Sequence, residues 1–398
     1  MDEQVCNPYR QMEILQQALA SDKSRIAFLM GAGCPVSISI QDGDKDSPLI
    51  EDIEGLTNTI CNNLKEENID KIITRISLPE GKNVTIEDIL SHVRLLIEVV
   101  GNGQIDGFSK TDLEKLERNI CEEISKAVSK EMPDNETPYH SLASWIRDIQ
   151  RNHPVEIFTP NYDLLIESAL ESKNIPYFDG FIGTRKAFFD LHSIEHEELP
   201  PRWVRLWKLH GSINWWNDSN GHVFRGPMES PGNKQMIYPS HLKYEQSRRM
   251  PYYAMQDRLG HFLATGQAVL ITCGYSFVDE HLNGIILERL STNPRAICFG
   301  LIYGELDDYP EAINFAKKIS NLSLIARNGA FIGRRKMNWS TKEHYTISHY
   351  DYCMEREMKD GGEDISIRCK IGDFKILGHF LFNQTRDTYD KESDESAE

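Results

Sequence analysis

The sequence predicts an α/β protein with a Rossmann-like, mostly parallel sheet, a helical insertion and a small C-terminal β region. Two observations predict this fold. Short apolar runs, such as Arg25–Met30, end at glycine or at polar residues, as buried parallel strands do. Segments with helical periodicity separate several of these runs, and strands that alternate with helices favour a parallel sheet.

The first part of the chain holds an opening helix and the insertion. The helix is expected over about residues 9–20, before the first strand. Residues from about 50 to 138 have the apolar spacing of amphipathic helices. Thr85 and Asp88 form a capping-box start for one of them. This block is predicted to be a helical insertion between two strands of the sheet.

The second part continues the alternation and then departs from it. Asn220-Gly221 is a hairpin turn signal, and the pattern changes again after Gly333. Further parallel strands are expected at residues 155–159, 203–209, 269–273, 296–301 and 322–325, helices at about 251–264 and 279–290, and late antiparallel strands at 344–347, 366–369 and 375–381. We therefore expect a main domain over residues 1–334, a β-rich region over 335–384 and a polar, acidic, disordered tail over 385–398.

Composition and charge exclude several classes of function. The 398 residues include 61 acidic and 44 basic side chains, and the net charge of -17 does not favour binding to nucleic acid or to an anionic membrane. No apolar run approaches the roughly 20 residues of a membrane span, and no secretory signal is recognisable. The eight cysteines form no C-x₂₋₄-C pair, which indicates reduced thiols in a cytoplasm rather than disulfides or a zinc ribbon.

A glycine-rich motif follows the first predicted strand, where ligands bind in open α/β sheets. The glycines of Gly31-Ala32-Gly33 would let the backbone approach a pyrophosphate near a helix N-terminus. The dinucleotide fingerprint has a third glycine three residues later, where this chain has Val36. A tight turn from strand to helix explains the motif equally well.

Two further motifs contain residues that could take part in binding or catalysis. In Thr159–Asp163, Asn161 offers a donor and an acceptor and Asp163 can bind an amide, although Asn and Asp also cap helices after strands. In Leu209–Ser212, His210 is a candidate general base, because histidine titrates near neutrality. A lone histidine is more often structural, but this one follows a strand as the other motifs do.

The fourth motif, Cys273–Asp279, also follows a predicted strand. Gly274 and Ser276 could bind a ribose or a phosphate, and Asp279 is expected to cap the next helix. Capping chemistry alone would also explain this motif.

Three titratable residues suggest a metal site that we reject. Asp190, His192 and His196 are close in the sequence, but their spacing is not the H-E-x-x-H arrangement. The acidic residues around them indicate a solvated surface, so no metal ligand is predicted.

The ordered set of motifs resembles that of sirtuins. Sirtuins have GAG after the first strand, a TQNID-like segment, an HG histidine and a GTS or GYS loop, and the counterparts here begin at Gly31, Thr159, Leu209 and Gly274. Arg327–Phe331 resembles the sirtuin segment near the adenine. The resemblance covers about residues 25–333 and implies that residues 1–334 form a sirtuin-like, NAD-binding catalytic domain.

Departures from the sirtuin pattern point to one branch of relatives. The CxxC pairs that hold zinc in sirtuin deacylases are missing, as is the GIPDFR segment, and Pro160 and Tyr162 replace the Gln and Ile of TQNID. The insertion lies where bacterial sirtuin-like antiphage proteins, which hydrolyse NAD+, have one. The length resembles the short form that partners a HerA-type hexameric ATPase. The resemblance implies a cytoplasmic, homo-oligomeric NAD+ glycohydrolase that depletes NAD and contains no zinc.

The resemblance also assigns roles to residues. Asn161 would position the ribose or the attacking water, and His210 would act as general base. NAD+ binding is assigned to Gly31, Ala32, Gly33, Thr159, Asp163, Gly274, Tyr275, Ser276 and Asn328, with Asp163 on the carboxamide. Two alternatives stay open: a sirtuin-like protein deacylase, disfavoured by the missing zinc module, and a non-catalytic nucleotide-sensing scaffold, disfavoured by the presence of both catalytic residues.

Overall fold

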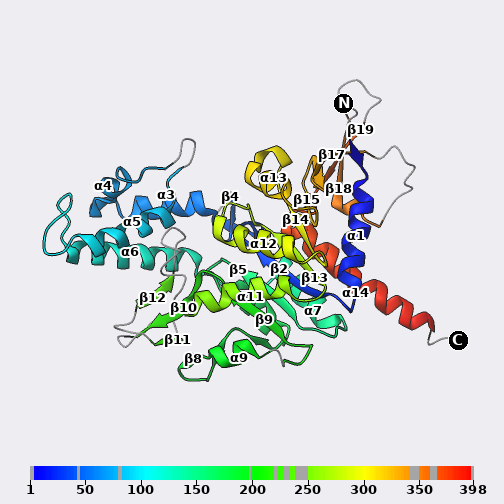
Figure 1. Ribbon diagram of the computed structural model, residues 1–398, viewed down its shortest axis with the longest axis horizontal. Coiled ribbons are helices and arrows are strands. Elements are labelled where there is room, and N and C mark those ends of the chain that lie inside the picture. The colour runs from blue at the N-terminus through cyan, green and yellow to red at the C-terminus, as the bar shows by residue number, and fades with distance from the viewer. Residues whose placement is uncertain are drawn as a thin grey trace.

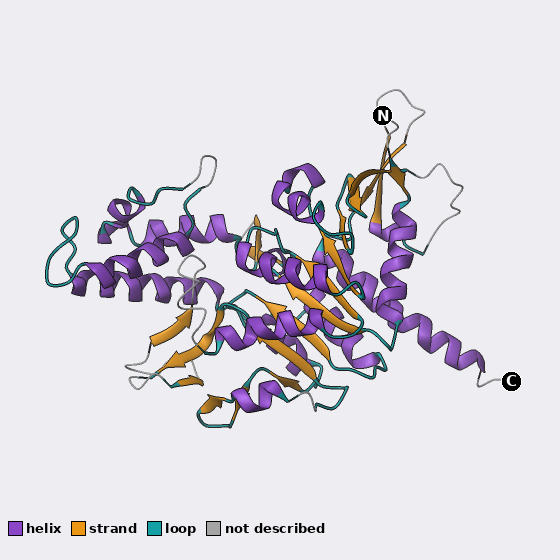
Figure 2. Ribbon diagram, in the orientation of Figure 1, coloured by secondary structure: helices purple, strands orange, loops and turns teal. Residues whose placement is uncertain are grey.

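The computed structural model describes most of the chain. The described residues are 4–42, 45–78, 83–196, 199–218, 222–226, 234–237, 250–340, 349–358 and 365–395. In them, helices pack on a large central sheet (Figures 1 and 2). The predicted α/β class with a mostly parallel sheet is confirmed.

A ten-stranded sheet, ordered β1-β17-β16-β15-β14-β13-β2-β5-β9-β6, forms this centre. The seven strands from β15 to β6 in this order are parallel to one another. Their bounds are β2 Arg25–Met30, β5 Val155–Thr159, β6 Tyr177–Phe178, β9 Val204–Lys208, β13 Ala268–Cys273, β14 Ala296–Leu301 and β15 Leu322–Ile325. Every parallel strand that the apolar runs predicted is therefore present, and the two-residue β6 is an addition.

Strands of mixed direction complete one side of the sheet. β16 (Gly329–Ile332) and β17 (Arg335–Trp339) are antiparallel to their predecessors, and β1 (Val5–Cys6) pairs in parallel with β17. The start of the chain thus lies beside the segment that follows Gly333.

The alternation of side chains along β2 explains how both faces of the sheet are buried. Ile26 and Phe28 belong to one apolar core, whereas Ala27 and Leu29 belong to the other, because successive side chains of a strand point to opposite faces. Helices α1 (Pro8–Ala20), α7 (Pro138–Asp148) and α8 (Leu165–Ser172) contribute to the first core. Helices α11 (Tyr252–Ala264), α12 (Glu280–Thr292) and α13 (Pro310–Ala316) contribute to the second.

The predicted helical insertion is present and lies to one side of the sheet (Figure 1). It contains α3 (Ile53–Asn63), α4 (Ile69–Ile73), α5 (Ile86–Val99) and α6 (Lys110–Val128). Thr85 and Asp88 form the predicted capping box of α5, and Ser109 and Asp112 form a second box at α6. These reciprocal hydrogen bonds satisfy backbone N–H groups that a helix N-terminus otherwise leaves unpaired.

A smaller antiparallel sheet, ordered β12-β10-β11-β8-β7, packs beside the main one. Its strands are β7 Phe181–Ile182, β8 Ala187–Phe189, β10 Gly211–Asn217, β11 Val223–Arg225 and β12 Lys234–Ile237. The predicted Asn220-Gly221 turn lies outside the described residues, but the strands that flank it do pair antiparallel. Arg225 ties this sheet to the buried Asp179 by an ion pair.

The C-terminal region corrects two predictions. β18 (Met354–Met358) pairs antiparallel with β19 (Ile365–Cys369), as expected near 366–369, while 344–347 lies outside the described residues. The strand predicted at 375–381 is wrong, because α14 spans Phe374–Glu395. Phe374, Leu377, Phe380 and Leu381 are all buried, and their spacing is that of one helical face.

The predicted disorder of 385–398 is likewise replaced by helix as far as Glu395. The polar composition is typical of a disordered tail, but here the segment continues a helix whose first half is packed against α7. Gly378 of α14 makes that packing close, since a Cβ there would lie 3.0 Å from the Cα of Pro138.

Short elements complete the chain. They are α2 Gly33–Val36, β3 Ser39–Asp42, β4 Lys45–Pro48, η1 Lys65–Glu67, α9 Leu191–Glu195, η3 Leu306–Asp308 and η4 Asp351–Cys353. No described helix is both long enough and apolar enough to cross a membrane.

Candidate functional site

The four sequence motifs converge at one edge of the main sheet. Strands β13, β2, β5 and β9 are neighbours in this order and run parallel, so the loops after them lie at the same edge. The strand order also changes direction here, because the chain builds outward from β2 on both sides. Such switch points are where open α/β sheets bind ligands.

The glycines of the first and fourth motifs bring two of these loops into direct backbone contact. Gly31 N donates to the carbonyl of Cys273 at 2.9 Å, and Gly33 N donates to that of Gly274 at 3.0 Å. A Cβ at Gly31 would overlap the Gly274 carbonyl, and one at Gly274 would lie 2.5 Å from the Cys34 nitrogen. Gly274 also has a φ of +62°, which favours glycine. Contact between the two loops therefore requires glycine irrespective of any ligand.

Replacing Gly31 by alanine is expected to destabilise the protein by about 1–3 kcal/mol, because rigid backbone on both sides must move. Gly284→Ala is the matched control. Gly284 lies exposed in α12 with open space around its Cα, so alanine there should stabilise the protein by about 0.5–1 kcal/mol. Urea denaturation of both variants measures the two changes. Equal, small effects would contradict the close contact of the loops.

The second motif is tied to the first by its polar side chains. Thr159 Oγ1 donates to the carbonyl of Met30 at 2.8 Å and accepts from Asn161 N at 3.0 Å. Asn161 Nδ2 donates to the carbonyl of Gly31 at 3.1 Å. The half-buried carboxamide of Asn161 is thus held beside the Gly31 loop, and Thr159 itself is buried.

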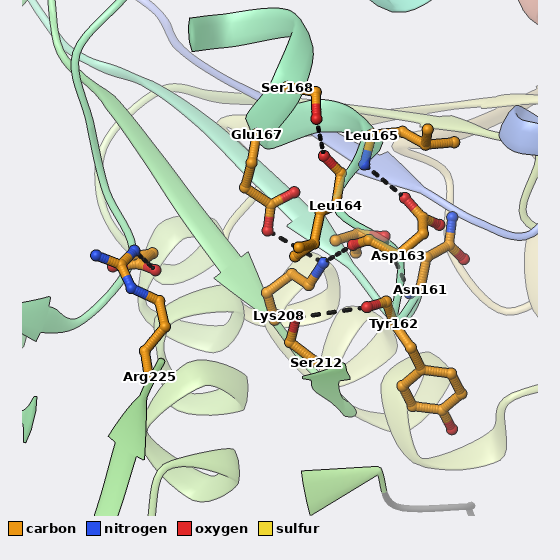
Figure 3. Close-up of polar contacts among 12 residues, drawn as sticks. Asn161, Tyr162, Asp163, Leu164, Leu165, Glu167, Ser168, Lys208, Ser212 and Arg225 are labelled. Carbon is orange, nitrogen blue, oxygen red and sulfur yellow. Dashed lines mark hydrogen bonds and ion pairs between the residues drawn. The ribbon is translucent and has the colours of Figure 1, made fainter. Parts of the chain in front are cut away.

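A buried charge cluster lies beneath this loop (Figure 3). Lys208, which is 1% exposed, donates to the backbone carbonyl of Asp163 and pairs with Glu167 at 3.2 Å. Asp163 Oδ1 accepts from Leu165 N at 3.0 Å, which is the helix-capping role considered from the sequence. Burial raises the pKa of Asp163 and of Glu167, while the Lys208 ammonium opposes both shifts. The cluster fixes the loop that carries Asn161.

His210 and Asp279 face each other across the same edge. His210 Nε2 lies 3.1 Å from Asp279 Oδ2, and both side chains are largely buried. This contact joins the loop after β9 to the start of α12, and β5 and β2 lie between the parent strands of these two elements. His210 Nε2 has no aligned hydrogen-bond partner among the described residues. The contact therefore becomes an ion pair when the imidazole takes up a proton.

The remaining predicted site residues differ in how far they are exposed to solvent. Ala32, Gly33 and Ser276 are exposed, so this part of the edge is open to a ligand. Tyr275 is buried, and its hydroxyl donates to Asn283 Oδ1 at 2.9 Å. Asn328 follows β15, two strands beyond β13, where its Oδ1 accepts from Leu306 N at 2.9 Å. In this structure Tyr275 and Asn328 therefore hold their own loops.

Three residues of this edge, Asp279, Lys208 and Glu167, have roles that the motifs do not predict. The sequence predicts Asp279 as a helix cap, and its position in a strand-end motif, like that of His210, is the only sequence signal that relates the two residues. Lys208 ends an apolar strand run directly before that histidine motif, and Glu167 follows Asp163 by one helical turn. Only the three-dimensional structure brings the last two together.

No metal cluster was found in the part of the chain that the structure describes. The rejected pair does share a face: the His192 and His196 rings lie 4.1 Å apart, and His196 Nδ1 lies 2.8 Å from the His192 carbonyl. Both are exposed, and neither belongs to a strand-end motif.

Residues 155–318 match the family model described as a SIR2-like domain. The match begins with β5 and ends just after α13, so this SIR2-like segment contains Asn161, His210 and Asp279. It supports a sirtuin-like fold for this part of the chain. No curated protein matches the sequence significantly.

Three of the similar solved structures cover about three quarters of this chain at low sequence identity. One, from work on the mechanism and regulation of Sir2 enzymes, has 11% identity and a TM-score of 0.38, over 79% of this chain and 90% of that one. A complex of a Sir2 homologue mutant with ADP-ribose has 16% identity and a TM-score of 0.35, over 75% and 87%. A structure on sirtuin substrate affinity has 14% identity and a TM-score of 0.34, over 75% and 90%.

Proposed function

We propose that this protein is an NAD+ glycohydrolase that cleaves NAD+ to nicotinamide and ADP-ribose. The observation that carries the proposal is the placement of Asn161 and His210 on strand-end loops of one sheet edge, inside the SIR2-like segment. Ala32, Gly33 and Ser276 are exposed beside them and would contact the nucleotide. NAD+ is the substrate, and no further cofactor is proposed.

The proposed chemistry needs only groups that this edge supplies. The bond between nicotinamide and ribose breaks through an oxocarbenium-like transition state, as in glycoside cleavage. The positive charge on the nicotinamide ring makes it a good leaving group. Water adds to the ribose, and His210 takes its proton as general base before releasing it to solvent. The Asn161 carboxamide would orient the ribose or the water.

Incubation of the purified chain with NAD+, followed by chromatography of the products, tests the proposal. We expect nicotinamide and ADP-ribose to appear in equal amounts without any peptide. Nicotinamide release that requires an acylated peptide would instead indicate the deacylase reading. Binding of NAD+ without turnover, in the presence and absence of partners, would leave only the scaffold.

The proposed biological setting is antiphage defence by NAD depletion in the cytoplasm, in a homo-oligomer that binds a HerA-type hexameric ATPase. The sirtuin-like resemblance supports this setting, and the net charge of -17 favours a partner that contacts DNA in its place. Closed rings are the common form of such assemblies. Native mass spectrometry should show a homo-oligomer alone and a joint complex with the ATPase, whose addition changes NAD+ turnover. A monomer indifferent to the ATPase would contradict this part of the proposal.

A further inference from the structure

We propose that Asp279 is the positioning residue for His210, an inference whose activity test rests on the proposed function. The two side chains are 8% and 13% exposed, and Nε2 of the histidine lies 3.1 Å from Oδ2 of the aspartate. A carboxylate so close to a buried imidazole selects its orientation and favours the proton on the facing nitrogen. Asp279 itself touches no reacting atom in this scheme.

Asp279 is held rigidly enough to act in this way. Its Oδ1 caps α12 by accepting from His281 N at 3.0 Å and from Leu282 N at 3.1 Å. One carboxylate oxygen thus fixes the side chain to the helix, while the other faces His210. Asp279 therefore both caps α12 and faces His210.

The loop that delivers Asp279 is itself constrained. Phe277 is fully buried with a φ of +59°, a conformation that is unusual for a non-glycine residue. Asn283 Nδ2 donates to the carbonyl of Phe277 at 2.6 Å, and Tyr275 donates to Asn283 Oδ1. Backbone held in such a conformation by its surroundings is frequent at functional sites.

The geometry assigns different tasks to the two ring nitrogens of His210. With Nε2 3.1 Å from Asp279 Oδ2, a proton on Nε2 is attracted to the carboxylate although the two atoms are not aligned as a hydrogen bond, and the lone pair of Nδ1 is left as the base. When Nδ1 takes the proton of the attacking water, the ring becomes an imidazolium beside the negative charge of Asp279. The carboxylate therefore stabilises the charge that general-base catalysis creates, without being protonated itself.

Asp279→Asn is the decisive variant, because asparagine is isosteric and caps helices as well as aspartate does. It keeps the cap and removes only the negative charge. We expect kcat for nicotinamide release to fall about 10- to 100-fold, as when carboxylates that orient a histidine are lost. KM and the melting temperature should change little. Asp52→Asn is the matched control, since Asp52 caps the remote helix α3 through Gly55 N at 2.9 Å.

A double-variant cycle separates positioning from a structural role. In a His210→Ala background, Asp279→Asn should reduce the residual kcat less than twofold, because Asp279 acts through the imidazole. An equal loss in both backgrounds, or wild-type kcat in Asp279→Asn alone, would overturn the proposal.

A spectroscopic measurement decides the inference even without activity. The imidazole ¹⁵N resonances of His210, assigned by their loss in His210→Ala, should show the neutral ring protonated on Nε2 in the wild type and a changed signature in Asp279→Asn. Protonation on Nδ1, unchanged by the substitution, would overturn it. Absence of nicotinamide release with the expected ¹⁵N signature would refute the proposed function and leave the Asp279–His210 pair standing.

Discussion

His210→Ala should lower the rate of nicotinamide release from NAD+ by about 10²–10⁴-fold, the range that general acid–base catalysis contributes. The histidine lies on a loop after β9 and not in a helix or strand, so the fold should survive its removal, and the melting temperature is measured beside that of the wild type because the side chain is buried. Initial rates measured by chromatography, at matched protein concentration and matched melting temperature, give the ratio.

His192→Ala is the control, because His192 is exposed on α9 and belongs to none of the strand-end loops. It should retain full turnover. Asn161→Ala should lose turnover like His210→Ala, at the stability cost of one hydrogen bond, about 0.5–1.5 kcal/mol. If His210→Ala kept wild-type turnover, the general base would have to be another group.

Lys208→Met should destabilise the fold by about 3–5 kcal/mol, the cost of leaving a buried charge without its partner. Methionine fills a similar volume, but Glu167 then lacks its ion-pair partner and the Asp163 carbonyl lacks its donor. Chemical denaturation of the variant and the wild type measures the difference. A second variant, Lys208→Met combined with Glu167→Leu, should recover part of the loss because neither charge remains.

The pH dependence of the free energy of unfolding is a second test of the destabilisation expected for Lys208→Met. Burial raises the pKa of Glu167 above its unfolded value, so its protonated form favours folding and this contribution is lost as the pH rises through the folded pKa. Without the ammonium the pKa rises further. The deficit of Lys208→Met should therefore shrink from neutral to mildly acidic pH. Lys126→Met, at an exposed i,i+3 pair, should leave the denaturation midpoint unchanged.

Much of the fold could be predicted because local patterns and tertiary structure agree. The apolar runs of β2, β5 and β13 are buried on both faces, and buried parallel strands need consecutive apolar residues. The capping box of α5 was readable since Thr85 and Asp88 are three residues apart. α14 was mispredicted because its apolar residues before Leu381 form a short run interrupted by Gly378, which was read as a strand although their spacing fits one helical face. Packing against α7 shows that this face is buried.

Only the location of the candidate site could be predicted from the sequence, and not the contacts between its side chains. Convergence of the motifs follows from parallel strands that end at one edge, so Asn161 and His210 could be assigned to it from the sequence. The role of Asp279 could not, since its distance from His210 depends on the fold of the loop around Phe277. Nor could the pairing of Lys208 with Glu167, because burial of a lysine has no local sequence pattern. The mutual contact of Gly31 and Gly274 is also a property of two distant segments.

The strand order also determines when the site can exist during synthesis of the chain. β2 pairs with β13 in the register Ala27↔Leu270, yet β13 begins only at Ala268. Domains fold from the N-terminus as the chain is made, and pairing between distant segments comes late. The insertion helices form from local contacts, while β2 keeps one edge unpaired until most of the chain has emerged. A growing chain therefore has neither Gly274 against Gly31 nor Asp279 against His210 until β13 and α12 have been made, and any activity of this edge begins only after that point.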